Sequence, residues 1–200
     1  VNVLCVDKTG TITRPDMSVS DVVFLKDNVG KLIAGVAGNM DDDNETMKAI
    51  KDYYHITGRD NSAERVYSFS SQNKYSGAVL DGRCYIFGAP EYVLLDTYAE
   101  YEDIFERYSG HGERILVFGE CVGDPCGNII EEAVNPYAFI ILENEIRDTA
   151  KETFGYFASQ GVDIVVISGD NPVTASKVAV RAGINNAENY IDATTLKSRQ

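Results

Sequence analysis

The sequence predicts an α/β protein in which a Rossmann-like parallel-sheet domain is interrupted by an α+β insertion. Two short apolar runs near the ends of the chain lead to this prediction. Val1–Val6 stops at Asp7, and Gly161–Ile167 stops at Ser168. Continuous Val/Ile runs of this length are typical of strands buried on both faces of a parallel sheet. The sequence between them lacks this pattern, and we expect it to form the insertion.

Helices are expected on both sides of the second apolar run. Before it, apolar residues recur at helical spacing: Ile146, Ala150, Phe154 and Phe157. Gly161 can end this helix. After the run, Asn171 can cap a second helix, Pro172 suits its first position, and Gly183 ends it. A helix, a strand and a helix in this order form the repeating unit of a doubly wound sheet.

The middle of the chain mixes strand and helix signals. Strands are expected at Asp21–Lys26, Val66–Ser70, Tyr75–Leu80, Arg83–Phe87 and Arg114–Glu120. Helices are expected at Lys31–Ala37, Asn44–Tyr54 and Tyr98–Tyr108. Asp81-Gly82 between two of the strands is a strong hairpin signal.

Composition limits the function classes. The 200 residues are 44% hydrophobic and 24% charged, with a net charge of −13. A chain this acidic is a poor ligand for nucleic acid, whose phosphates need a basic surface. The longest apolar run, Tyr137–Leu142, is far shorter than the roughly 20 residues of a membrane-spanning helix. We therefore expect no nucleic-acid partner and no membrane insertion of the chain itself. The four cysteines are expected to be free thiols.

The segment from Asp7 to Thr13, Asp-Lys-Thr-Gly-Thr-Ile-Thr, carries the clearest chemical signal. Asp7 is expected at the carboxyl end of a strand, where open α/β sheets bind ligands. The following Gly and Thr residues can hold a phosphate through backbone amides and hydroxyls. A carboxylate attacks phosphorus when a cation neutralises the repulsion between the anions. Asp7 is therefore the candidate nucleophile, and its product would be an aspartyl phosphate.

A second polar segment, Ser168-Gly169-Asp170-Asn171, ends the other predicted strand. The carboxyl ends of parallel strands share one edge of a sheet, so we expect Ser168, Gly169 and Asp170 beside Asp7. Ser168 and the helix N-terminus can hold a phosphoryl group, and Asp170 can accept a hydrogen bond or act in the outer shell of a metal.

The segment Asp7–Thr13 closely resembles the phosphorylation signature of P-type cation-transporting ATPases, within the haloacid dehalogenase-like superfamily. The resemblance covers essentially the whole chain. It implies that residues 1–20 and 138–200 form a discontinuous, C-terminally truncated phosphorylation domain. Residues 21–137 would form the nucleotide-binding domain inserted into it.

The resemblance also implies roles for the residues after Asp7. The Asp7 carboxylate and the Thr9 carbonyl would bind Mg²⁺, and Lys8 would offset phosphate charge. Soluble phosphatases of the superfamily carry a second Asp where this chain has Thr9. Without that acid/base group water is poorly activated, so the aspartyl phosphate should persist. This favours a pump over a simple phosphatase.

The insertion carries the residues that the resemblance assigns to ATP. Phe69 and Lys74, in Phe-Ser-Ser-Gln-Asn-Lys, would stack on adenine and line its pocket. Glu45 would contact the adenine amino group, and Arg114 would reach the phosphates. Phe87 and Gly88, in Phe-Gly-Ala-Pro-Glu, stand where the family has Lys-Gly-Ala-Pro-Glu; the change removes a cation from the pocket.

Arg147 completes the nucleotide-binding candidates. It fits the Arg of the family's Asp-Pro-x-Arg segment, whereas Asn144 replaces the Asp. We expect the chain to be a piece of a longer bacterial protein with actuator and transmembrane domains, on the cytoplasmic face of a membrane. A further Lys and a Gly-Asp-Gly-x-Asn-Asp segment of the family pattern do not occur in it, so we expect it to bind ATP without turnover. The transported ion is not specified, and calcium is only weakly indicated.

Two other functions fit the same residues. One is a soluble phosphohydrolase with a large cap, which would release phosphate from a generic phosphomonoester. The other is a non-catalytic nucleotide-binding module, which would bind ATP without forming an acid-stable, hydroxylamine-labile phosphate.

Overall fold

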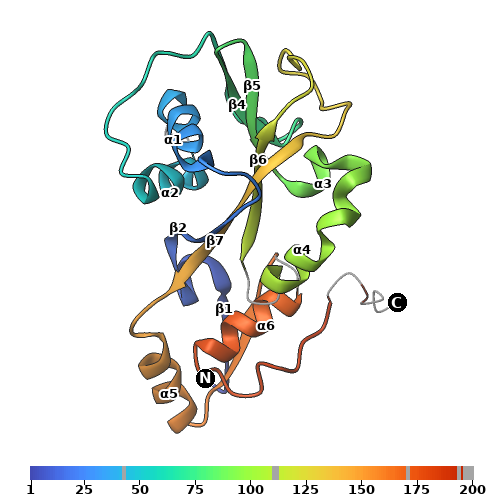
Figure 1. Cartoon of the computed structure of the whole chain (residues 1–200). Coiled ribbons are helices and arrows are strands. Elements are labelled where there is room, and N and C mark those ends of the chain that lie inside the picture. Colours follow the sequence, from blue (N-terminus) through green and yellow to red (C-terminus); the bar gives the residue numbers. More distant parts are fainter. Residues whose placement is uncertain (42–43, 110–112, 170–171, 193–194, 196–200) are drawn as a thin grey trace. The chain divides into compact units, whose positions relative to one another are not determined.

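The computed structural model describes residues 1–41, 44–109, 113–169, 172–192 and 195. Its strands are β1 Val3–Asp7, β2 Thr13–Phe24, β3 Arg65–Tyr67, β4 Tyr75–Leu80, β5 Arg83–Gly88, β6 Arg114–Glu120, β7 Asn135–Ile146 and β8 Asp163–Ile167. Its helices are α1 Val29–Asn39, α2 Glu45–Tyr53, α3 Pro90–Val93, α4 Glu102–Ser109, α5 Ala150–Ser159 and α6 Pro172–Arg181. A turn, η1, spans Lys8–Ile12, and a tight helical segment, η2, spans Leu95–Tyr101 (Figure 1). The predicted α/β class is confirmed.

Two compact units share the chain. Unit 1 comprises Val1–Asp16, Tyr108–Glu113 and Asn144–Gln200; unit 2 comprises Met17–Arg107 and Arg114–Glu143. Unit 1 therefore joins the two ends of the chain. Within the described residues, no helix is both long and apolar enough to cross a bilayer.

Unit 1 is built on a parallel pair of strands. β1 and β8 pair in register from Val3 opposite Asp163 to Asp7 opposite Ile167. One face of this pair joins α5 and α6 in a small core. Its members are Ile12, Ala150, Phe154, Val178, Ala179, Ala182 and Ile184, with Val6, Ile164 and Val166 packed against them. Helix α6 begins at Pro172, as the sequence predicted.

The expectation that both faces of these strands are buried is wrong for the described chain. Burial alternates along β1 and β8. Val3 is 50% exposed and Ile167 is 61% exposed. A run of apolar residues shows that a strand is hydrophobic, but it does not show whether one face or both are covered.

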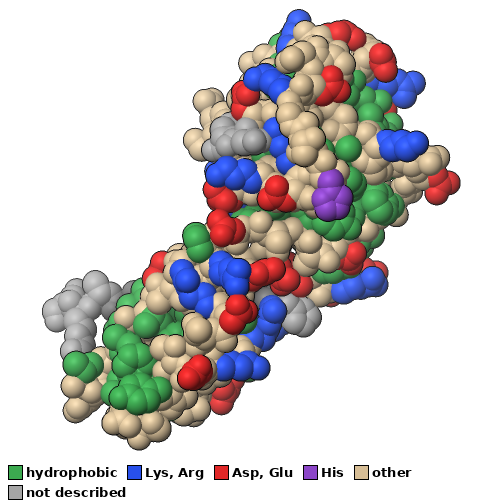
Figure 2. All heavy atoms as spheres, turned by 90° about the vertical axis from the view of Figure 1, so that its left-hand side faces the viewer, with side chains coloured by type: hydrophobic (Ala, Val, Ile, Leu, Met, Phe, Trp, Pro, Cys, Tyr) green, Lys and Arg blue, Asp and Glu red, His purple; other side chains and the backbone are tan. Residues whose placement is uncertain are grey.

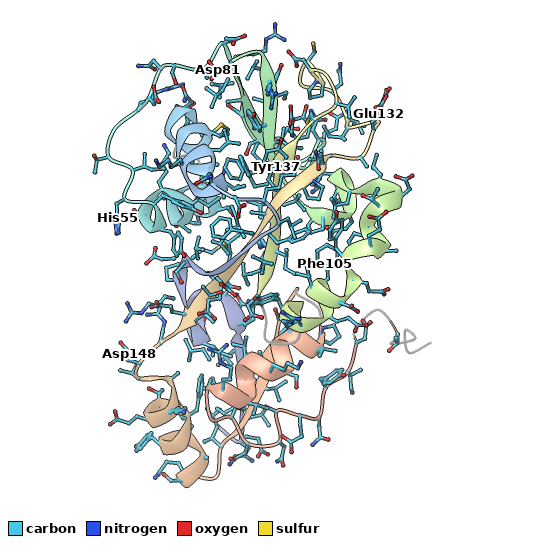
Figure 3. All side chains as sticks on the ribbon, viewed as in Figure 1. His55, Asp81, Phe105, Glu132, Tyr137 and Asp148 are labelled. Carbon is cyan, nitrogen blue, oxygen red and sulfur yellow. The ribbon has the colours of Figure 1, made fainter. Side chains whose placement is uncertain are left out.

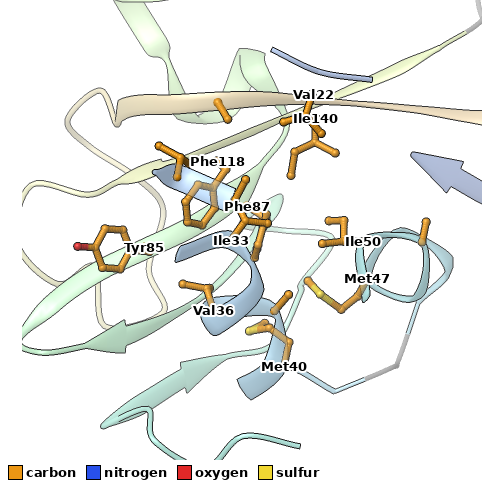
Figure 4. Packing of buried hydrophobic residues seen from close by; sticks show 14 of the residues in the cluster. Val22, Ile33, Val36, Met40, Met47, Ile50, Tyr85, Phe87, Phe118 and Ile140 are labelled. Atoms are coloured by element: carbon orange, nitrogen blue, oxygen red, sulfur yellow. The ribbon is translucent and has the colours of Figure 1, made fainter. Parts of the chain in front are cut away.

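Unit 2 is built on a six-stranded sheet in the order β2-β7-β6-β5-β4-β3. The pairs from β3 to β7 are antiparallel. Helices α1 and α2 supply side chains at helical spacing to the core of this unit, including Ile33, Val36, Met47 and Ile50 (Figure 4). Strand residues such as Phe118 and Ile140 face them.

Several predicted boundaries need correction. The expected strand Asp21–Lys26 is the end of the longer β2, and Val66–Ser70 shortens to β3. The expected helix Tyr98–Tyr108 divides into the end of η2 and α4. Ile146 ends β7 instead of beginning a helix. The structure bears out β4, β6 and the Asp81-Gly82 hairpin.

The described surface carries mixed charge. In Figure 2, acidic and basic side chains are interspersed on the face shown.

Candidate functional sites

Asp7 lies where a parallel sheet presents ligand-binding groups. It is the last residue of β1 and pairs with Ile167, the last residue of β8. Ser168 and Gly169 follow directly, so both strands deliver polar residues to one edge of unit 1. Asp7 is exposed and Ser168 is half-buried. The fourth expected residue of this group, Asp170, lies outside the described residues.

The turn η1 shapes the backbone after Asp7. One carboxylate oxygen of Asp7 accepts the backbone N–H of Lys8 at 2.8 Å. Gly10 has φ +80°, a conformation that favours glycine. The turn closes where the backbone N–H of Thr13 donates to the Lys8 carbonyl. The exposed Asp7 carboxylate thus sits on a hydrogen-bonded turn, with Thr9 also exposed.

Arg147 binds this turn directly. Its backbone N–H donates to the Ile12 carbonyl at 3.0 Å. Its guanidinium Nη2 donates to the Gly10 carbonyl at 2.6 Å. The resemblance placed Arg147 among the nucleotide-binding residues, whereas the structure ties it to the Asp7 turn. Sequence reasoning missed this contact because the two residues lie 137 positions apart.

A polar cleft of about 350 Å³ lies beside Arg147 in unit 1. Its lining residues are Arg14, Pro15, Asp16, Arg147, Asp148 and Thr149. The Arg14 guanidinium pairs with the Asp148 carboxylate at 2.7 Å; Figure 3 labels Asp148 in the segment between β7 and α5. Both side chains are well exposed, so the pair contributes about 1 kcal/mol or less.

Lys8 differs from its neighbour Asp7 in exposure. Its side chain belongs to the buried polar residues, at 4% exposure. The phosphate-neutralising role that the resemblance implies for Lys8 stays a prediction.

In unit 2 the strand register brings three candidate residues to one end of the sheet. Tyr75 at the start of β4 pairs with Gly88 at the end of β5. Gly88 pairs in turn with Val117 near the start of β6. This end of the sheet therefore holds Lys74, Gly88 and Arg114. Arg114 lies three residues before Val117 on β6, at a distance of about 10 Å.

Gly88 is required by close packing. A Cβ at this position would lie 2.3 Å from Cγ1 of Val93 and 3.3 Å from Cβ of Tyr75. A side chain would therefore push α3 away from β5 and disturb the end of the sheet. This gives Gly88 a structural role at the candidate site.

Phe69 and Lys74 lie in the turn between β3 and β4. The Lys74 backbone N–H donates to the Ser70 carbonyl at 2.9 Å, and Phe69 is 48% exposed. The ring of Phe69 is thus available to a planar ligand. The Lys74 ammonium lies 5.9 Å from the ring centre of Tyr92. Tyr92 was not among the expected site residues, although it follows the Phe-Gly-Ala-Pro-Glu segment directly.

Glu45 and Arg114 occupy separate elements. Glu45 begins α2, where its charge suits the helix N-terminus, and its carboxylate pairs with Lys48 at 2.7 Å. Arg114 begins β6 and is exposed. Within the part of the chain that the structure describes, no hydrogen bond or ion pair joins Glu45 to Phe69 or Lys74.

Phe87 belongs to the core of unit 2. Its side chain is 2% exposed, and its ring centre lies 4.8 Å from that of Phe118. Figure 4 shows Phe87 beside Ile33 and Phe118. The Phe87 side chain therefore packs inside unit 2, and we no longer expect it to contact a bound ligand.

Residues 1–198 match the family of haloacid dehalogenase-like hydrolases. The calcium-transporting ATPase CtpE of Mycolicibacterium smegmatis is 36% identical over 187 residues, which are 92% of this chain and 23% of that protein. The potassium-transporting ATPase ATP-binding subunit of Xanthomonas axonopodis pv. citri is 25% identical over 194 residues, or 93% of this chain and 27% of that protein. The chain thus spans about a quarter of the length of these relatives.

Solved structures share the fold. A zinc-transporting PIB-type ATPase in the E2.Pi state superposes with a TM-score of 0.66 at 18% identity, covering 92% of this chain and 28% of that one. The catalytic domain of the CPx-ATPase CopB-B gives a TM-score of 0.62 at 12% identity, covering 92% of this chain and 61% of that one. At these identities the likeness concerns the fold alone.

Proposed function

The chain belongs to the haloacid dehalogenase-like hydrolase family, and we propose that it is the ATP-binding and phosphorylation part of a P-type cation-transporting ATPase. The observation that carries this proposal is the exposed Asp7 carboxylate at the end of β1, on the turn that Arg147 holds. The relatives named as calcium- and potassium-transporting ATPases match more than nine-tenths of this chain.

The proposed chemistry is phosphoryl transfer to Asp7. A carboxylate oxygen attacks the γ-phosphorus of ATP, the bond from that phosphorus to the bridging oxygen breaks, and ADP leaves. Catalysis of this kind rests on positioning and charge stabilisation. The Asp7 turn supplies the positioning, because Arg147 and Thr13 hold its carbonyls. Ser168 and Gly169 offer a hydroxyl and a backbone amide at the same edge.

The oxygen atoms at this edge suit Mg²⁺. The exposed residues Asp7 and Thr9 offer a carboxylate and a backbone carbonyl, and Mg²⁺ prefers such oxygen ligands. The described residues contain no cluster of three or more metal-binding side chains. That fits a metal held by one carboxylate, a carbonyl, water and substrate phosphates. When bound, Mg²⁺ would neutralise the charge of the phosphates.

Thr9 favours a persistent phosphoenzyme in this proposal. A general acid/base at this position would activate water against the aspartyl phosphate, and a threonine hydroxyl cannot do so at neutral pH. A long-lived phosphoenzyme can bias a conformational equilibrium. In the whole protein we propose that this equilibrium belongs to actuator and membrane domains, with the present chain on the cytoplasmic face.

The proposed nucleotide site lies in unit 2, at the sheet end that holds Lys74, Gly88 and Arg114. The half-exposed Phe69 ring offers a stacking surface for adenine, and Lys74 and Arg114 supply positive charge for phosphates. Glu45 is proposed as a contact to the adenine amino group. Phe87 supports this end from the core.

Calorimetric titration of the chain with ATP tests the nucleotide site, with GTP as comparator. We expect ATP to bind at sub-millimolar affinity, or about −4 to −6 kcal/mol, and to be preferred over GTP. Phe69→Ala should abolish binding without unfolding, because the ring is half-exposed. Tyr156→Ala is the matched control, since Tyr156 is an exposed aromatic residue of α5 in unit 1.

The titration has a clear negative outcome. If Phe69→Ala binds ATP as tightly as the unaltered chain, the adenine site is misplaced. If the unaltered chain binds neither nucleotide, the assignment of this sheet end to ATP fails.

A further inference from the structure

Cys84 and Cys121 face each other across two neighbouring strands of unit 2. Tyr85 of β5 pairs with Glu120 of β6, so Cys84 and Cys121 form the next facing pair. The backbone N–H of Cys121 donates to the Cys84 carbonyl at 2.9 Å, which continues the ladder. Facing residues of this hydrogen-bonded type have Cα atoms about 5.5 Å apart, within the usual range for a disulfide.

Both cysteines lie on the same side of the sheet. Tyr85 and Phe87 of β5 face the core formed with α1 and α2. Cys84 alternates with them and therefore faces the other side, as does its partner across the ladder. Cys84 is 3% exposed and Cys121 is 8% exposed. The two thiols are thus held together in a buried position.

The thiols also differ electrostatically. A hydrogen bond from the Cys121 thiol holds the pKa of Cys84 below its ordinary value. The same hydrogen bond, together with burial, raises the pKa of Cys121. Cys84 is therefore the better candidate for an attacking thiolate, and Cys121 for the resolving thiol. An attacking thiolate next to a resolving thiol is the arrangement found in redox-active pairs.

We propose that Cys84 and Cys121 form an oxidation site, at which hydrogen peroxide or a similarly small peroxide converts the two thiols into a cross-strand disulfide. Cys121 is the first residue after β6 and both thiols are buried, so the oxidant has to be a small uncharged molecule. This proposal does not depend on ATP binding or on phosphorylation of Asp7.

The reaction balances in two steps. The Cys84 thiolate attacks one peroxide oxygen and the O–O bond breaks, which gives a sulfenic acid and, with the proton that Cys84 released, water. The Cys121 sulfur then attacks the Cys84 sulfur and the S–O bond breaks. The hydroxyl leaves with the Cys121 proton as a second water. Two thiols and one peroxide thus give one disulfide and two waters, with each sulfur losing one electron.

The disulfide should stabilise unit 2, because it ties β5 to β6 in the unfolded chain as well. We expect a rise in melting temperature of about 5–10 °C on oxidation, reversed by dithiothreitol. Cys5 and Cys126 are the exposed cysteines and serve as the internal comparison.

The test uses the unaltered chain and the double variant Cys5→Ser/Cys126→Ser, each treated with one equivalent of hydrogen peroxide. Remaining thiols are alkylated under denaturing conditions, and the digested peptides are mapped by mass spectrometry. We expect a peptide pair linked through Cys84 and Cys121 in both proteins, and none in Cys84→Ser.

The double variant keeps both buried cysteines, so its result does not depend on whether Cys84→Ser folds. If its Cys84 and Cys121 are both alkylated after peroxide treatment, the proposal is overturned. A disulfide that joins Cys126 to either buried cysteine in the unaltered chain, in place of the Cys84–Cys121 link, also overturns it.

Discussion

Replacing Arg147 with Met isolates the contribution of its guanidinium to the Asp7 turn. Met keeps the aliphatic part of the side chain and leaves the backbone bond from residue 147 to Ile12 in place. The substitution removes the 2.6 Å bond to the Gly10 carbonyl. A hydrogen bond from a charged donor contributes roughly 1.5–3 kcal/mol. Because this one is exposed, we expect about 1–2 kcal/mol.

Hydrogen exchange of the Thr13 amide measures this loss directly. That amide closes the turn by donating to the Lys8 carbonyl, and Thr13 is 1% exposed. A loss of about 1–2 kcal/mol corresponds to an exchange rate roughly 5–30 times faster. The assay is exchange followed by NMR on the folded variant.

The matched control is Arg83→Met in unit 2. Its guanidinium lies 3.8 Å from Glu120 at the surface, so its loss should leave Thr13 exchange unchanged. If Arg147→Met folds and its Thr13 amide exchanges no faster than in this control, Arg147 does not hold the turn.

Three other predictions concern stability and are checked by urea unfolding. Gly10→Ala should lower the free energy of unfolding by about 1 kcal/mol, because Gly10 has φ +80°. The loss stays this small because no described atom lies within 4 Å of the new Cβ. An unchanged free energy of unfolding would show that the turn relaxes freely. Tyr54→Phe should be neutral or stabilising by up to about 1 kcal/mol, because the described residues provide no hydrogen-bond partner for the buried hydroxyl; clear destabilisation would reveal one. Burial raises the pKa values of Tyr67, Tyr75 and Tyr137 to about 12. The unfolded chain loses these protons from about pH 10, so their stabilising contribution should be complete below pH 10 and lost as the pH rises towards 12; a flat profile would contradict the burial of these hydroxyls.

The sequence correctly predicted elements that depend on hydrogen bonds between residues close together in the chain. The Asp81-Gly82 pair between two expected strands indicated the β4–β5 hairpin, and the structure has it. The helix expected at Asn44–Tyr54 is α2, and the Asn44 side chain caps its start by accepting the Met47 backbone N–H. In these cases neighbouring residues supply the hydrogen bonds that define the element.

Long-range pairing explains what the sequence did not show. Arg14-Pro15-Asp16 has a polar turn composition, yet it lies within β2, which pairs with β7. Tertiary pairing overrides the local preference there. The bond between Arg147 and Gly10 belongs to the same class, because nothing near either residue identifies the other.

The candidate site shows the same limit at single residues. A motif placed Phe87 in the nucleotide pocket, but its alternation with Cys84 and Ile86 along β5 turns it towards α1 and the core. Motif likeness gives the position of a residue along the chain, and strand register decides which face it occupies.

In the proposed function, Asp7 accepts a phosphoryl group. The most direct measurement incubates the whole protein that contains this chain with ATP labelled at the γ-phosphate and Mg²⁺, followed by acid quenching. We expect an acid-stable, hydroxylamine-labile phosphate on the protein, and we expect Asp7→Asn to eliminate it. Label that persists in Asp7→Asn, or no label in a protein that binds ATP, would contradict it.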